Sequence, residues 1–177
     1  MIKHHPNFEE IDVQNYTRMI LKGLQCIHAK GYVHCDLKPS NVLVFPSKDG
    51  CPCRLKITDF GLSKEPGETV GEQYKFHATP RYMSPESLVI GQIGVALDIW
   101  SLGCIVVEMV TKKTMWGDHK DDYLGELMCQ LVAGNDDVLL PESLSEEGKD
   151  FLNKCFEIDP RKRWTASMLL NHPFIAS

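Results

Sequence analysis

The sequence lacks a long apolar run and lacks an excess of positive charge. No stretch reaches the roughly 18 consecutive apolar residues that span a membrane, and the opening MIKHHPNFEE has no apolar core of the signal-peptide kind. With 19 basic and 24 acidic residues, the net charge is -5, which disfavours a nucleic-acid groove or an anionic membrane as main partner. We expect an intracellular protein, cytoplasmic or nuclear, with neither nucleic acid nor membrane as a partner.

Paired cysteine motifs are also scarce. The 7 cysteines are scattered and odd in number, which favours free thiols in a reducing compartment over a disulfide framework. Cys51 and Cys53 form a lone C-x-C pair, and no second pair at matching spacing supplies the other ligands of a zinc site. We interpret them as thiols of a hairpin, with a cysteine-based metal scaffold as the weaker alternative.

The first half of the chain predicts one helix followed by a hairpin. Asp12 can cap a helix that Gly31 ends, and its apolar positions recur at spacings of three and four: Val13, Tyr16, Ile20, Leu24 and Ile27. Two short apolar runs, 42–45 and 54–58, flank a turn that contains Asp49 and Gly50. We predict two strands there.

The second half predicts a long loop and then helices. Residues 59–86 show no usable period, and a loop of this length is commonly functional. The run 95–110 is apolar on nearly every side, so we expect a buried helix, in which Asp98 needs hydrogen-bond donors. Further helices are expected over 123–133, over 146–157 after a Ser145 cap, and from a Thr165 cap to a stop at Pro173. With 43% hydrophobic residues and no repeat, the chain is one mostly helical region.

Polar residues crowd the segment HCDLKPSNVL, residues 34–43, just before the predicted hairpin. The tripeptide DFG, residues 59–61, follows the hairpin, so strand pairing should bring both segments to the same edge. Phosphoryl transfer needs oxygen ligands for magnesium, a cation near the phosphate and a carboxylate that accepts the hydroxyl proton. These two segments contain each of those groups.

The motifs HCDLKPSN, DFG and SPE stand in the order of the protein-kinase motifs H-R-D-L-x-x-x-N, D-F-G and A-P-E. With DIWSLGC and DPRKRWTASMLLNHPF, they make the chain resemble the large C-terminal lobe of a eukaryotic serine/threonine protein kinase. The resemblance implies a protein-kinase-like fold over residues 1–177: a mainly α C-terminal lobe with a short β-hairpin, a catalytic loop at 34–41 and an activation segment at 59–86. No glycine-rich loop or V-A-I-K lysine precedes residue 34, so we expect the N-terminal β lobe to be absent.

The resemblance implies a role for each site residue. Asp36 would accept the proton of the substrate hydroxyl, and Lys38 would lie near the transferred phosphate of ATP. Asn41 and Asp59 would bind Mg²⁺. Thr79 would hold Asp36 and Lys38 in place, and Lys38 followed by Pro39 is the form found in serine/threonine kinases.

A second set would be structural. The resemblance implies that Phe60 packs on His34, that Asp98 receives backbone donors from the catalytic loop and that Glu86 pairs with Arg163. Two further residues, Trp116 and His119, we interpret as surface or packing residues without assigned chemistry.

The segments YTRMILKGLQCIHAKGYVHCDLK and PRYMSPES are most similar to plant mitogen-activated protein kinase kinase kinases. This likeness implies protein substrates, namely downstream kinases, and leaves the oligomeric state open. Cys35 stands where the common loop has arginine, so a phosphate at Ser63, Thr69 or Tyr74 would lack its usual cationic partner. The alternative is a truncated, non-catalytic interaction module or pseudokinase fragment.

Overall fold

Helices dominate the part of the chain that the computed structural model describes, which is residues 8–45, 53–65, 79–117, 123–134, 138 and 140–176. The elements follow in the order α1 (Glu10–Ala29), η2 (Pro39–Asn41), β1 (Val42–Phe45), β2 (Arg54–Ile57), η3 (Pro80–Tyr82), α3 (Pro85–Ile90), α4 (Val95–Thr111), α5 (Leu124–Val132), α6 (Glu146–Cys155), α7 (Ala166–Leu169) and α8 (Pro173–Ala176). The architecture is mostly helical with a two-stranded antiparallel sheet, as predicted.

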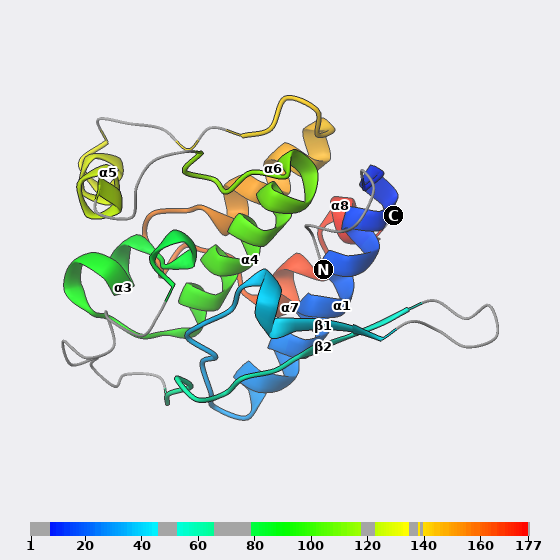
Figure 1. Ribbon diagram of the computed structural model, residues 1–177, viewed down its shortest axis with the longest axis horizontal. Coiled ribbons are helices and arrows are strands. Elements are labelled where there is room, and N and C mark those ends of the chain that lie inside the picture. The colour runs from blue at the N-terminus through cyan, green and yellow to red at the C-terminus, as the bar shows by residue number, and fades with distance from the viewer. Residues whose placement is uncertain are drawn as a thin grey trace.

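Helix α4 forms the centre of the core. Every residue from Leu97 to Met109 is buried, and α1, α6 and η3 all pack against α4 (Figure 1). A methyl group at Gly103 would lie 2.7 Å from Cε1 of Phe156, so only glycine permits this close approach of α4 to the end of α6. The fully apolar pattern of the sequence therefore corresponds to a helix enclosed by its neighbours.

Helix α1 begins earlier than predicted. Its first residue is Glu10, and Asp12 lies inside the first turn, where its Oδ2 accepts the backbone N–H of Glu9 at 3.3 Å. The prediction of Asp12 as the cap is wrong because this carboxylate acts in a capping box, from the third helical position. The predicted stop is confirmed, since Gly31 follows the helix with φ +78°, a conformation that favours glycine.

The hairpin lies beside α1 (Figure 1). Val42 pairs with Ile57 and Phe45 with Arg54, and β2 ends one residue before the predicted Thr58. A methyl group at Gly23 would lie 2.9 Å from Cδ1 of Ile57, so α1 and β2 are in tight contact. The turn with Asp49, Gly50 and Cys51 lies outside the described residues.

Helix α3 was not predicted, and two predicted helix ends are wrong. Helix α3 begins at Pro85, within the segment predicted as loop, because proline favours the first helical turn. For the same reason Pro173 starts α8 rather than only stopping the helix that Thr165 caps, which ends at Leu169. Helix α6 ends at Cys155, two residues early.

The other two predicted caps are confirmed: Ser145 Oγ accepts Gly148 N–H at 3.1 Å, and Thr165 Oγ1 accepts Met168 N–H at 3.3 Å. Within the ranges that the structure describes, no helix is both long enough and apolar enough to cross a bilayer.

Candidate active site

Asp98, on α4, holds the backbone of the segment that follows α1. The side chain is fully buried, and its two oxygens accept the backbone N–H groups of His34 at 2.8 Å and of Cys35 at 3.0 Å. Cys35 has φ +68°, a left-handed conformation that is unfavourable for a residue with a side chain. The carboxylate therefore stabilises a turn that the local sequence would not adopt alone.

His28 is a further partner of Asp98 that the sequence analysis did not identify. Its Nε2 lies 2.8 Å from Oδ2 of Asp98, so the end of α1 also meets this carboxylate. Seventy positions separate the two residues, and neither periodicity nor a motif links them. Only the packing of α1 against α4 brings them together.

Asp36, Lys38 and Thr79 form one contiguous polar cluster. Lys38 Nζ lies 2.7 Å from Asp36 Oδ2 and 2.9 Å from Thr79 Oγ1, and the Thr79 hydroxyl donates to Asp36 Oδ1 at 3.1 Å. Asp36 is buried, while Lys38 is partly exposed. Each oxygen of the Asp36 carboxylate thus has a partner, and these contacts fix the orientation of the carboxylate beside Lys38.

Asn41 joins this cluster from η2. Its Nδ2 donates to the backbone carbonyl of Asp36 at 2.8 Å and to Asp36 Oδ2 at 3.2 Å, which leaves the side-chain oxygen as an acceptor. The backbone carbonyl of Asn41 accepts Thr58 N–H at 2.9 Å, so the residue after β2 is tied to η2. Asp59 follows directly, exposed and with φ +66°.

These positions can be tested for magnesium. No group of three or more His, Cys, Asp or Glu side chains in the described ranges could hold a metal ion by itself. Asn41 and Asp59 instead offer one amide oxygen and one carboxylate, which are ligands that suit a hard cation completed by phosphate oxygens and water. Asp59 makes its described side-chain hydrogen bond to Gly61 N–H, at 3.4 Å, and not to the Asp36 cluster. The donor set fits Mg²⁺.

His34 is held as a structural residue. Its ring lies edge-on to Phe60, with 5.0 Å between ring centroids, and its Nε2 lies 2.9 Å from the carbonyl of Thr58. Its Nδ1 accepts the backbone N–H of Asp36 at 3.4 Å. The expected contact with Phe60 is therefore present. Both ring nitrogens already have hydrogen-bond partners, so His34 is not free to act as a base.

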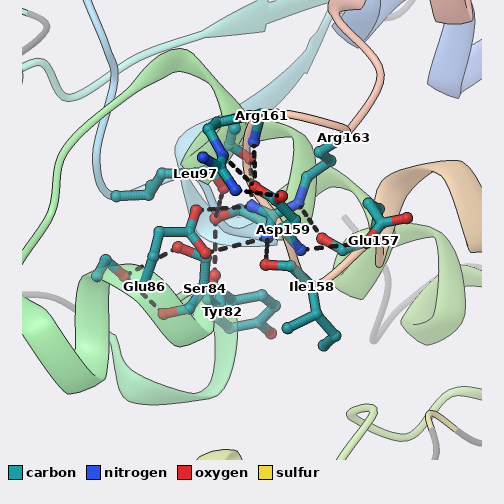
Figure 2. Close-up of polar contacts among 12 residues, drawn as sticks. Tyr82, Ser84, Glu86, Leu97, Glu157, Ile158, Asp159, Arg161 and Arg163 are labelled. Carbon is teal, nitrogen blue, oxygen red and sulfur yellow. Dashed lines mark hydrogen bonds and ion pairs between the residues drawn. The ribbon is translucent and has the colours of Figure 1, made fainter. Parts of the chain in front are cut away.

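Glu86 and Arg163 form a separate pair, with no described contact to the Asp36 cluster. Figure 2 shows the carboxylate of Glu86 meeting the guanidinium of Arg163 in a bidentate ion pair of 2.7 and 3.0 Å. Arg163 also donates to the carbonyls of Glu157 and Ala96, at 2.8 and 2.9 Å. The pair links α3 to the segment after α6, and it has no contact with Asp36.

Tyr82 and Glu108 were not identified from the sequence. The Tyr82 hydroxyl donates to Glu108 Oε2 at 2.5 Å, and burial, followed by this hydrogen bond, raises the pKa of Tyr82. Ser101 Oγ also donates to the Tyr82 carbonyl, at 2.7 Å. Helix α4 therefore contacts both the hydroxyl and the backbone carbonyl of Tyr82, which lies three positions after Thr79.

The sequence is similar to those of known proteins over nearly its whole length. The protein kinase domain model matches residues 1–175. Mitogen-activated protein kinase kinase kinase 20 of Arabidopsis thaliana is 45% identical over 169 residues, covering 94% of this chain and 48% of the relative. Mitogen-activated protein kinase kinase kinase 17 of the same plant is 41% identical over 171 residues, which cover 96% of this chain and 44% of the relative. Human mitogen-activated protein kinase kinase kinase 4 is 38% identical over 174 residues, which cover 94% of this chain and 10% of the relative.

The chain spans about half the length, or less, of these curated relatives. The match nevertheless covers nearly every residue of this sequence, and the family motifs lie where the geometry places the polar cluster. The chain belongs to the protein kinase family.

Proposed function

We propose that this chain is the large lobe of a serine/threonine protein kinase that transfers the γ-phosphoryl group of ATP to protein hydroxyls. The observation that carries the proposal is the cluster in which Asp36 contacts both Lys38 and Thr79, at 2.7 and 3.1 Å. A buried carboxylate with a cation beside it is what in-line transfer from a nucleotide to a hydroxyl requires.

In this proposal each member of the cluster has one task. Asp36 orients the acceptor hydroxyl and accepts its proton, while the ammonium of Lys38 neutralises charge on the transferred phosphoryl group. Thr79 holds both side chains through its hydroxyl. Asn41 and Asp59 are the residues that would bind Mg²⁺, and the bound ion would neutralise phosphate charge.

The domain boundaries follow from the same proposal. Residues 34–41 are the catalytic loop, 59–86 the activation segment and 1–177 a partial kinase domain. Because the relatives are named mitogen-activated protein kinase kinase kinases, we propose downstream protein kinases as the protein substrates. Cys35 in place of the loop arginine makes this a kinase without the usual arginine-aspartate pair.

A second candidate is a non-catalytic interaction module. The 177 residues contain neither a glycine-rich phosphate loop nor a V-A-I-K lysine, and these groups ordinarily cover and orient the nucleotide. By themselves, residues 1–177 could still present the helical lobe to partners. The intact Asp36, Lys38, Asn41 and Asp59 favour the enzyme.

The deciding experiment uses a completed enzyme, meaning residues 1–177 joined to a kinase small lobe such as that of the 45%-identical relative. We expect Asp36→Asn to lower the rate of phosphoryl transfer by about 10² to 10⁴. The matched control is Asp12→Asn, the same chemical change near the start of α1. If the completed enzyme folds and binds ATP but shows no transfer, the interaction module is favoured. If Asp36→Asn retains the wild-type rate, as the control should, the role proposed for Asp36 is wrong.

A further inference from the structure

The turn that follows Thr79 is too short to hold itself in place. Residues 79–82, the acceptor platform, consist of Thr79 and the single 3₁₀ turn η3, which is closed by backbone hydrogen bonds from Tyr82 N to Thr79 O and from Met83 N to Pro80 O. A lone 3₁₀ turn is marginal in water, because few hydrogen bonds offset the backbone entropy that it loses. Its position must therefore come from outside the segment.

Trp116 supplies one external contact. Its indole Nε1–H donates to the backbone carbonyl of Arg81 at 3.1 Å, and the ring is 9% exposed. The sequence analysis interpreted Trp116 as a surface or packing residue, and the structure shows a buried side chain with a specific hydrogen bond. His119 lies outside the described residues.

Arg81 returns the contact. Its Nη1 donates to Thr114 Oγ1 at 3.0 Å and to the carbonyl of Gly117 at 3.2 Å. The Thr114 hydroxyl also donates to the Gly117 carbonyl, at 3.2 Å, and Gly117 has φ +57°. Turn 114–117 thus binds the main chain of Arg81 through Trp116, and the side chain of Arg81 binds the same turn. We call these reciprocal hydrogen bonds the Arg81–Trp116 clasp.

This reciprocal contact lies two residues from Thr79, whose hydroxyl meets both Asp36 and Lys38. We propose that the Arg81–Trp116 clasp positions the acceptor platform, so that Trp116 is a positioning residue for the protein substrate. The substrate role rests on the proposed function. Asn41 lies in η2 and Asp59 lies two residues after β2, and neither makes a described contact with the clasp. The clasp therefore contacts the acceptor platform and not the residues proposed to bind Mg²⁺.

The first test uses residues 1–177 and the variant Trp116→Phe, which removes the indole N–H but keeps most of the apolar ring. We expect amide hydrogen exchange at residues 81–83 to accelerate about fivefold, the equivalent of one ordinary hydrogen bond. Thr114→Val, which removes one of the two acceptors of Arg81, should act in the same direction. Trp164→Phe is the matched control, the same change at a tryptophan whose ring lies against His172. Exchange rates that Trp116→Phe leaves unchanged would overturn the clasp.

The second test uses the completed enzyme. Trp116→Phe should raise KM for the acceptor protein about fivefold, the same single hydrogen bond, and leave KM for ATP unchanged. A merely structural loss would lower the fraction of folded enzyme, and hence kcat, without this split between the two substrates. Faster exchange with no change in acceptor KM would overturn the positioning role. Absence of transfer by the wild type would refute the proposed function, while the exchange result would still decide whether the clasp exists.

Discussion

Arg163 and Glu86 form a bidentate ion pair across 77 positions of sequence, and both side chains are almost completely buried. The guanidinium also lies over the ring of Trp100, 5.1 Å from its centroid. The pair therefore joins α3, α4 and the segment after α6 at one point. A buried charge of this kind is costly to leave without its partner.

Arg163→Ala should consequently destabilise the lobe by about 3 to 5 kcal/mol, because the Glu86 carboxylate would remain buried without its cation. For a chain of this size we expect the midpoint of thermal unfolding to fall by roughly 6 to 20 °C. Lys162→Ala, at the exposed neighbouring position, is the control and should change the midpoint little. Equal shifts for the two variants would show that the ion pair contributes nothing.

Asp98→Asn tests the support of the backbone at His34 and Cys35. The buried carboxylate accepts N–H groups from His34 and Cys35, and an amide would present an N–H group to one of these donors. We expect a loss of about 2 to 3 kcal/mol in chemical denaturation, with faster exchange of the His34 and Cys35 amides. Asp12→Asn, which keeps an acceptor for the Glu9 N–H and loses only a charge at the start of α1, should cost less, about 0.3 to 1 kcal/mol. If Asp98→Asn behaves like that control, the proposed support is wrong.

Residues 1–177 alone should not phosphorylate a generic protein substrate. The side chains proposed to bind Mg²⁺ do not by themselves orient ATP without a phosphate-covering loop and its lysine. The assay would measure transfer of labelled phosphate to a basic test protein at saturating Mg²⁺-ATP. Turnover that disappears in Asp36→Asn would contradict this prediction and show that the lobe is sufficient.

Asp150 gives a pH dependence with a defined sign. A hydrogen bond from His172 is the main reason that the pKa of Asp150 lies below its usual range. A carboxyl whose pKa is lower in the folded state stabilises that state above its unfolded pKa, about 3.9, and loses the effect as pH falls through the folded value. The difference in melting temperature between wild type and Asp150→Asn should therefore be constant from about pH 7 to 5 and shrink below about pH 4. A difference that grows on acidification would contradict the assignment.

Cys35 predicts weak control by phosphorylation. The thiol is 2% exposed and has no permanent charge, so it does not pair with a phosphate as an arginine does. In the completed enzyme we expect phosphatase treatment, or alanine at Ser63, to change the initial rate by less than about tenfold. Thr69 and Tyr74, the other candidate hydroxyls, lie outside the described residues. A loss of about a hundredfold or more on dephosphorylation would mean that another cation binds the phosphate.

The sequence by itself predicted the kind of structure and its chemistry. The periodicity of α1, the glycine that ends it and the fully apolar α4 are local patterns, and local patterns survive folding because they depend on neighbouring residues. The ordered motifs brought the family, and with it the expected contacts of His34 with Phe60 and of Glu86 with Arg163. Apart from α3, for which no helix was predicted, the errors fell at ends of elements, where proline and a capping box admit more than one boundary.

The tertiary structure decided which distant residues meet. His28 reaches Asp98 because α1 packs on α4, and Trp116 reaches the carbonyl of Arg81 because the turn after α4 folds back onto η3. Neither pair has a spacing that distinguishes it in the sequence, since a long-range contact depends on how side-chain volumes fill the core between the elements. The sequence supplies the residue types that phosphoryl transfer needs, while packing around α4 sets their orientation.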